Sequence, residues 1–166
     1  AIRNQMGIVL QDPYIFSDTL FYNIALGNRN VGKKEALKAL EMVGATDILE
    51  SNVMDEKILD HGSMLSSGQR QLISFARALA QNPKILILDE ATSSIDSQTE
   101  EIIQNAMSIL MKGRTTFIIA HRLSTIKNAD KIYLLEKGRI LEEGNHETLI
   151  QKKGKYYEMY QAQNID

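Results

Sequence analysis

Residues 84–94 read KILILDEATSS. The four apolar residues Ile85–Leu88 form a run that is too short for a helix and is typical of a buried strand. Two acids, Asp89 and Glu90, follow it directly. In open α/β sheets ligands bind beyond the carboxyl ends of the strands, where one acid can hold a magnesium ion and its neighbour can polarise an attacking water. A buried strand that ends in two solvated acids is the alternative interpretation.

Two further apolar runs have the same form and predict two more strands. MGIVL occupies residues 6–10 and FIIA residues 117–120, and the polar residues Gln11 and His121 follow them. Helical patterns, each closed by a glycine or by Asn-Pro, lie between the runs. They cover residues 19–26, 33–43, 68–81 and 98–112. This alternation predicts an α/β fold with a mostly parallel sheet.

The C-terminal part has a different pattern, which predicts a hairpin and two short helices. Residues 131–136 and 139–143 flank Lys137-Gly138, and helices are expected at 146–152 and 155–163. Upstream, residues 12–80 carry only helical signals. We therefore expect 12–80 to form a helical subdomain inserted into a core made of 1–11 and 81–166.

Composition excludes several classes of protein. The chain has 166 residues, a formal net charge of −2 and no cysteine. Its charges are mixed, so no basic surface for nucleic acid is expected, and the missing cysteines exclude disulfides and thiolate metal sites. No apolar run reaches the roughly 18 residues that a membrane span needs. The first residues, AIRNQ, are not a natural start, and we expect the chain to be a piece of a longer protein.

The segment LSSGQRQLISFARALAQNP, residues 65–83, predicts a capped helix. Ser66 and Gln69 have the spacing of a capping box, and Gly68 would let a ligand approach the first turn. The free N–H groups at such a helix start attract anions. The alternative is an ordinary amphipathic helix that buries Leu72, Ile73, Phe75, Ala76 and Leu79.

Taken together, these motifs resemble the ATP-binding domain of ABC transporters. LSSGQ resembles the signature LSGGQ with Ser67 in third place, ILILDE resembles the Walker B strand, and SSID at 93–96 resembles the D-loop. Gln11 resembles the Q-loop glutamine and His121 the switch histidine. The motifs span about residues 5 to 145 in the family's order. The wording SGQRQLISFARAL with EATSSID is most similar to the exporter, or multidrug, branch.

The resemblance implies a fold and a set of roles. The fold would be part of a P-loop NTPase (RecA-like) domain with its helical insertion. Glu90 would be the general base for attack on the γ-phosphate of ATP, and Asp89 would bind Mg²⁺ through its water shell. Gln11 would add a metal or water contact. His121 would hold the γ-phosphate, although a packed structural histidine is also compatible with the apolar TTFIIA before it.

The resemblance also implies partners. The turn of Ser66, Ser67, Gly68 and Gln69, together with Asp96 of the D-loop, would bind a nucleotide held by a second ABC ATPase domain. A transmembrane domain would be the other partner, at the cytoplasmic face of the cell membrane, and no nucleic acid is expected. Spacing along the chain does not itself distinguish binding within one domain from binding across two.

Two departures from the family pattern stand out. The exporter element Val-Gly-Glu-x-Gly is replaced by Ile58-Leu59-Asp60-His61-Gly62. The family's phosphate loop and the aromatic residue that stacks on adenine belong upstream of the Q-loop. Since Gln11 is so close to the first residue, both would lie before Ala1.

One stretch of the sequence partly matches the phosphate-loop motif. GNRNVGKK, residues 27–34, fits G-x-x-x-x-G-K-[ST] except for its last letter, where Lys34 replaces the hydroxyl that would meet magnesium. A buried strand should lead into such a loop, but a helical pattern that ends at Gly27 precedes it. We therefore predict a coincidence, with Lys33 and Lys34 solvated at the start of a helix that packs through Ala36, Leu37 and Leu40.

Two rival functions remain. The first is an ABC-type ATPase of DNA repair or chromosome organisation, which would be expected to show long coiled coils or basic surfaces. The second is a non-catalytic module that dimerises or docks through PYIFSDTLFY, residues 13–22.

Overall fold

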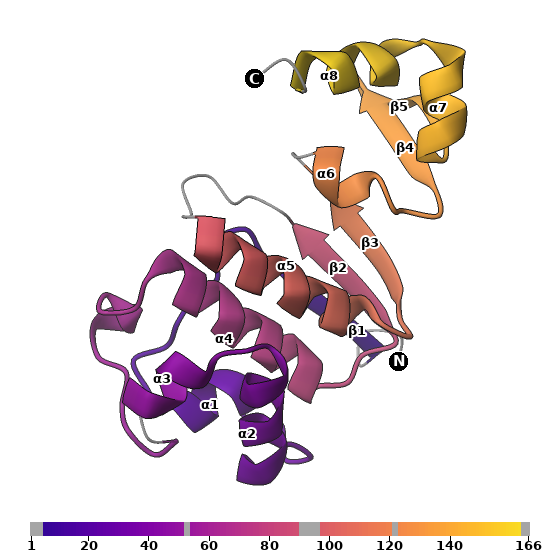
Figure 1. Ribbon diagram of the computed structural model, residues 1–166. Coiled ribbons are helices and arrows are strands. Elements are labelled where there is room, and N and C mark those ends of the chain that lie inside the picture. The colour runs from indigo at the N-terminus through magenta and orange to yellow at the C-terminus, as the bar shows by residue number, and fades with distance from the viewer. Residues whose placement is uncertain (1–4, 52–53, 90–96, 121–122, 164–166) are drawn as a thin grey trace. The chain divides into compact units, whose positions relative to one another are not determined.

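The computed structural model describes residues 5–51, 54–89, 97–120 and 123–163. The chain forms two compact units, Ala1–Ile119 and Ala120–Asp166. Glu90, Asp96 and His121, for which roles are predicted, lie outside the described residues. Figure 1 shows the order of the elements along the chain.

The first unit contains a three-stranded parallel sheet, as the three apolar runs predict. Its strands are β1 (Met6–Val9), β2 (Ile85–Asp89) and β3 (Thr115–Ile119), in the order β1-β2-β3. Ile8 of β1 pairs with Ile87 of β2, which pairs with Phe117 of β3. The last strand begins earlier than predicted because two β-branched threonines, which suit a pleated strand, extend it.

Between β1 and β2 the described residues form helices and loops, with one isolated bridge between Thr19 and Lys57. All four predicted helices are present with nearly the predicted bounds. Three of them lie between β1 and β2 in the chain, and the fourth follows β2. They are α1 (Leu20–Ala25), α2 (Lys33–Met42), α4 (Ser67–Ala80) and α5 (Ser97–Met111). Two short elements of the first unit were not predicted: α3 (Thr46–Ser51) and the 3₁₀ turn η2 (Asp60–Gly62).

Two details of the helix predictions are wrong. The left-handed residue that ends α1 is Leu26, with φ 48°, and Gly27 follows it with φ 72°, so glycine is not the cap itself. Helix α2 buries Ala36 and Leu40, but Leu37 is exposed. Leu37 thus lies beside the buried stripe of α2 and not in it.

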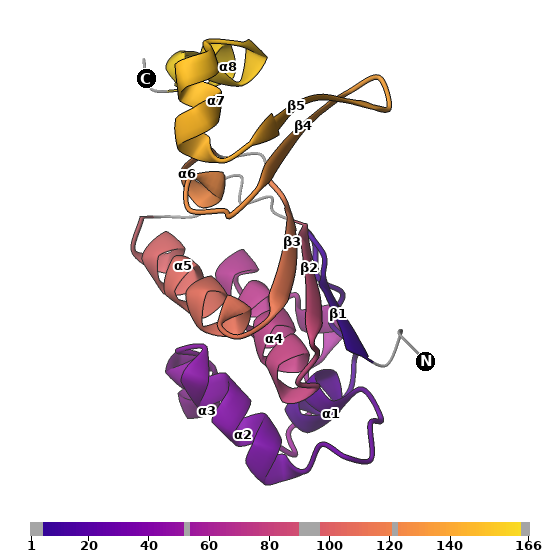
Figure 2. The same cartoon turned by 90° about the vertical axis from the view of Figure 1, so that its right-hand side faces the viewer.

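Helices α4 and α5 cover one face of the sheet, as Figure 2 shows with the strands seen from their edge. Val9, Leu86 and Leu88 are buried on this covered face. Side chains alternate along a strand, so their neighbours lie on the opposite face. There Ile8, Phe117 and Ile119 are 57%, 59% and 54% exposed. Within the described part of the first unit, the sheet therefore has one packed face and one apolar face whose side chains are largely exposed.

The second unit is the predicted hairpin with short helices. It consists of β4 (Ile132–Glu136), β5 (Arg139–Gly144), α7 (His146–Lys152) and α8 (Lys155–Gln163), together with α6 (Leu123–Ile126), a short helix that was not predicted. The strands are antiparallel, and both turn residues, Lys137 and Gly138, have positive φ, as a tight hairpin requires. Ile132, Leu149 and Tyr156 form its small core. In neither unit does a described helix have the length and apolar content that crossing a membrane demands.

Candidate functional site

Asp89 and Gln11 lie at the same end of neighbouring strands. Val9 pairs with Leu88 across the parallel ladder, so the chain after β1 leaves the sheet beside the end of β2. Asp89 closes β2 and is half-buried, whereas Gln11 is exposed. Among the described residues no group of three or more His, Cys, Asp or Glu side chains could hold a metal ion. These two residues thus offer one carboxylate and one amide to a ligand.

The signature turn at the start of α4 contains the predicted capping box. Ser66 is the N-cap, and its hydroxyl Oγ accepts a hydrogen bond from the Gln69 N–H at 3.1 Å. In return, Oε1 of Gln69 accepts from the Ser66 N–H at 2.9 Å. No acidic residue lies in the first turn of α4. The first N–H groups of a helix have no partner within it, so this exposed helix start favours an anion.

The other end of the Gln69 amide is also bonded. Its Nε2 donates to Oδ2 of Asp47, on α3, at 2.9 Å. Sequence reasoning missed Asp47, because it lies 22 residues before Gln69 in a six-residue helix that has no readable pattern. Nearby, Nη1 of Arg70 donates to the Leu65 carbonyl at 2.7 Å and holds the chain that enters the turn.

The structure explains why a glycine suits position 68, which the sequence alone does not reveal. A Cβ atom at this buried position would lie 2.3 Å from the Cγ2 methyl of Thr99, on α5. Real Cβ atoms do not approach so closely, so any larger residue here would force the Thr99 side chain or helix α5 to shift. Thr99 occupies the space into which a Cβ atom of residue 68 would point. The approach of a ligand to the first turn stays a prediction.

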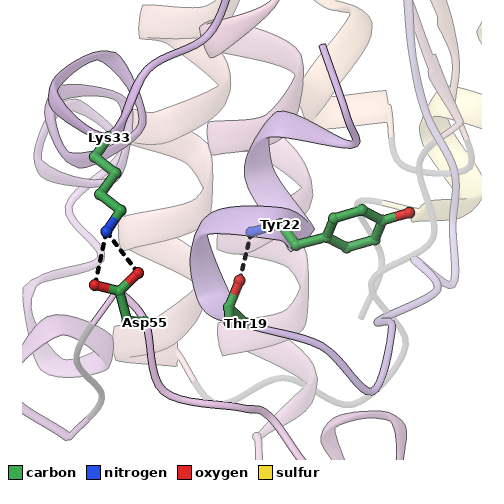
Figure 3. A network of polar contacts seen from close by, with 4 residues as sticks. All are labelled: Thr19, Tyr22, Lys33 and Asp55. Atoms are coloured by element: carbon green, nitrogen blue, oxygen red, sulfur yellow. Dashed lines mark hydrogen bonds and ion pairs between the residues drawn. The ribbon is translucent and has the colours of Figure 1, made fainter. Parts of the chain in front are cut away.

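The start of α2 shows what the stretch GNRNVGKK forms. Helix α1 precedes it, as predicted, and no strand does. Figure 3 shows the Lys33 ammonium held between both carboxylate oxygens of Asp55, at 2.6 and 2.7 Å. Lys33 is exposed, as predicted, but it is ion-paired and not simply solvated. Glu35 accepts from the Gly32 N–H at 3.1 Å, which places a carboxylate at this helix start.

An exposed aromatic cluster, Tyr14, Phe16 and Tyr22, lies in the segment after Gln11. The ring centroids of Tyr14 and Phe16 are 4.9 Å apart and those of Phe16 and Tyr22 are 5.8 Å apart. Tyr14 and Phe16 are 55% and 38% exposed. The hydroxyl of Tyr14 contacts Nδ1 of His61 at 3.0 Å, which joins this cluster to the turn η2 before the signature. The cluster is therefore a fixed apolar surface with a polar edge.

Arg77 connects that segment to α4. Its Nε donates to the Asn23 carbonyl at 2.7 Å, and its Nη2 donates to the Tyr14 carbonyl at 3.0 Å. Burial lowers the pKa of the Arg77 guanidinium from its ordinary value. The two carbonyl oxygens supply the polar contacts that such a desolvated cation needs. The helix that begins at the signature is thus bonded to the residues that follow Gln11.

Comparison with known proteins identifies the family. The family model described as ABC transporter matches residues 1–93. A probable multidrug resistance ABC transporter ATP-binding/permease protein of Bacillus subtilis is 54% identical over 164 residues, which are 98% of this chain and 24% of that protein. An ATP-dependent lipid A-core flippase of Syntrophus aciditrophicus is 50% identical over 98% of this chain and 28% of its own length. The chain thus spans about a quarter of these relatives.

A solved structure gives the same answer. The structure of a bacterial Atm1-family ABC exporter with ATP bound superposes with a TM-score of 0.84 at 39% identity, over 97% of this chain and 28% of that one. The sheet, the helices of the first unit and the hairpin therefore define an α/β protein of the P-loop NTPase class. The chain belongs to the ABC transporter family. The fold and the family that the order of motifs predicted are both confirmed.

Proposed function

We propose that this chain is part of the ATPase domain of an ABC exporter and that the intact protein hydrolyses ATP to move a solute across a membrane. The observation that carries the proposal is the signature turn: an exposed helix start, capped by Ser66 and Gln69, with no acid in its first turn. It favours an anionic ligand for physical reasons that do not depend on the resemblance. The named relatives, which are exporters and ATP-binding/permease proteins, support the assignment.

In this proposal the strand ends carry the chemistry. Glu90 is the general base that orients water toward the γ-phosphate, and His121 holds that phosphate. Ser66, Ser67, Gly68 and Gln69 bind a nucleotide held by a second ABC ATPase domain, and Asp96 contributes from the D-loop. Donors placed where negative charge develops supply much of the rate enhancement of phosphoryl transfer.

The donor set of the described strand ends fits Mg²⁺. Asp89 is the proposed ligand, with Gln11 as a second oxygen donor. Magnesium takes oxygen ligands, keeps several waters and is bound by one or two carboxylates together with substrate phosphates. When bound, Mg²⁺ neutralises charge on the phosphate oxygens. Asp89 is half-buried at the end of β2, so its backbone is held by the strand while its side chain is partly accessible.

The proposed assembly has two further partners and one place in the cell. A second ABC ATPase domain completes the nucleotide site, and a transmembrane domain at the cytoplasmic face of the membrane receives the motion. Residues 12–80 are the proposed helical subdomain, with 1–11 and 81–166 in the catalytic core. The aromatic cluster of Tyr14, Phe16 and Tyr22 is exposed on that subdomain and suits a protein partner, as exposed aromatic groups do.

The exposed aromatic cluster also suits the second rival, a purely docking module. Hydrolysis distinguishes the two, because a docking module needs no base at position 90. The DNA-linked rival lacks support, since the named relatives are transport proteins and the net charge is −2.

The test is Glu90→Gln in the full-length protein. The amide keeps the size of the side chain but cannot accept the proton, so Mg²⁺-dependent ATP hydrolysis should fall by about 10²-fold or more while ATP still binds. Glu101→Gln, an exposed carboxylate of α5, is the matched control and should leave turnover unchanged. Near-normal hydrolysis by Glu90→Gln would contradict the proposal.

The 166 residues alone should bind ATP weakly and lack magnesium-dependent ATPase activity. Their sequence contains no complete G-x-x-x-x-G-K-[ST] motif, which normally supplies most of the contacts to the phosphates. Purified chain should therefore show no turnover above its Glu90→Gln variant. Turnover that this substitution removes would show that the chain is sufficient for catalysis.

A further inference from the structure

We propose that Asp47 is a positioning residue of the signature turn, which it controls by fixing the orientation of the Gln69 amide. The inference rests on the proposed function of that turn. It is supported by a chain of hydrogen bonds from α3 to the start of α4. Nε2 of Gln69 donates to Oδ2 of Asp47, and Oε1 of Gln69 accepts from the Ser66 N–H. Both distances are 2.9 Å.

The direction of these bonds makes the carboxylate decisive. An ionised carboxylate can only accept, and a backbone N–H can only donate, whereas an amide side chain offers one end of each kind. Asp47 therefore requires the NH₂ group of Gln69, and this leaves Oε1 for the Ser66 N–H. If the amide turned over, NH₂ would face the Ser66 N–H as donor against donor, and the capping box would lose one of its two bonds.

The carboxylate is presented by a fixed piece of backbone. Ala45 and Ile48, on either side of Asp47, are fully buried. The Ala45 N–H also donates to the Leu40 carbonyl at 3.0 Å, which ties the start of α3 to the end of α2. Asp47 itself is exposed at the surface of the unit, so its side chain contributes little to the core.

The receiving end is equally well anchored. Leu72 and Ile73, one turn further along α4, are buried in the core, and Gln69 is half-buried. Ser66 and Ser67 are exposed, so the N-cap is the least packed part of the turn. Buried Leu65 and the Arg70 N–H, which donates to the Ser66 carbonyl at 3.0 Å, hold the Ser66 backbone from one side. The bonds through Gln69 hold its N–H and hydroxyl from the other.

The same carboxylate could simply stabilise α3, because an acid in the first turn of a helix interacts favourably with the helix dipole. That role would affect folding but not the signature turn. The two roles differ in what depends on Gln69. If Asp47 acts through Gln69, its removal should have no further effect once Gln69 is truncated.

The experiment compares Asp47→Ala, Asp47→Asn, Gln69→Ala and the Asp47→Ala/Gln69→Ala double variant in the full-length protein. Asp55→Ala is the matched control, because it removes an exposed carboxylate from the same unit and breaks only the ion pair with Lys33. Steady-state ATP hydrolysis gives kcat and KM, and thermal unfolding of each variant reports the fold.

We expect Asp47→Ala to lower kcat by about five- to tenfold, as the loss of a charge-assisted hydrogen bond allows, with KM changed by less than about twofold. Asp47→Asn, whose carbonyl oxygen can still accept from Nε2, should recover most of the activity. The double variant should match Gln69→Ala. Asp55→Ala should keep normal kcat.

Equal and additive losses for Asp47→Ala and Gln69→Ala would overturn the inference, and so would normal kcat in Asp47→Ala. Failure to rescue by Asp47→Asn would also contradict it. The Glu90→Gln variant separates this result from the proposed function. If Glu90→Gln is inactive while Asp47→Ala is normal, only the positioning role fails; if Glu90→Gln is normal, the catalytic assignment fails first.

Discussion

Two helices of this chain begin in nearly the same way and offer very different surfaces. The start of α2 follows Gly27-x₄-Gly32-Lys33, and the start of α4 is LSSGQR. Each has a side chain three residues beyond the N-cap that bonds back to the N-cap N–H, Glu35 in α2 and Gln69 in α4. The sequence of α2 matches a phosphate loop more closely, yet its start is the poorer anion site.

The difference is one of charge and of which groups are already bonded. Glu35 brings a carboxylate to the start of α2, and the Lys33 ammonium is held by Asp55. At α4 the corresponding residue is the neutral Gln69, and the first turn contains no acid. At α2 the Glu35 carboxylate bonds the N-cap N–H directly, whereas at α4 the nearest acid of those bonds, Asp47, reaches the N-cap only through the neutral Gln69 amide. A phosphate would therefore meet less opposing charge at α4. Spacing alone therefore misleads, and the partners of each polar group decide.

The largest expected effect comes from placing the same bulky cation at both N-caps of the full-length protein. Ser66→Arg should lower ATP hydrolysis by about 10²-fold or more, because it removes the capping hydroxyl and fills the space where the γ-phosphate would bind. Gly32→Arg is the control, since its backbone φ of −86° accepts any residue. The ATPase rates of the two variants provide the measurement. Equal activity would mean that the signature turn has no special role.

The next largest effect on ATP turnover should come from changing the charge of the side chain that bonds back to the N-cap N–H, residue 69 in α4 or residue 35 in α2. Gln69→Glu keeps an oxygen for the Ser66 N–H but places a second carboxylate against Asp47 and close to a bound phosphate. We expect ATP turnover to fall by about tenfold, since like charges in contact oppose each other. The opposite exchange, Glu35→Gln, should leave turnover unchanged. A larger loss in Glu35→Gln than in Gln69→Glu, measured as kcat, would reverse the comparison.

The two glycines test packing in place of charge. Gly68→Ala puts a methyl 2.3 Å from Cγ2 of Thr99, and overpacking of this kind costs about 1–3 kcal/mol of unfolding free energy. Gly32→Ala meets only the flexible end of Glu35, so it should cost less than about 1 kcal/mol, the usual loss for a poor N-cap. Urea unfolding provides both values.

Thr99→Ser removes the offending methyl and sharpens this test. The Gly68→Ala/Thr99→Ser double variant should recover most of the stability that Gly68→Ala loses. No recovery would mean that glycine is needed at position 68 for a reason other than the approach of α5.

These contacts also mark the limit of what the sequence predicts. Short apolar runs sufficed for the three strands, and capping signals for α4, because both are local patterns. The contacts Asp47–Gln69 and Gly68–Thr99 join residues from different helices, which no local pattern encodes. Helix α3 has only six residues, too few for a periodic signal. Leu37 has suitable spacing for the core but lies beside the buried stripe of α2.

The smallest expected effect is that of Lys33→Ala, and it decides whether GNRNVGKK is a phosphate cradle. A lysine that reached the β- and γ-phosphates would lose a charge-assisted contact worth about 1.5–3 kcal/mol, and hydrolysis would collapse. In the structure its ammonium is bound to Asp55 instead, and the two side chains are 57% and 67% exposed. An exposed ion pair of this kind contributes about 0–1 kcal/mol, so stability should change by no more than about 0.5 kcal/mol. ATP affinity and turnover of the full-length protein should stay within about twofold, and Asp55→Ala should behave in the same way, because it breaks the same pair from the other side. Loss of nucleotide binding in Lys33→Ala but not in Asp55→Ala would show that the lysine contacts nucleotide. That result would assign phosphate binding to the start of α2 in place of the start of α4.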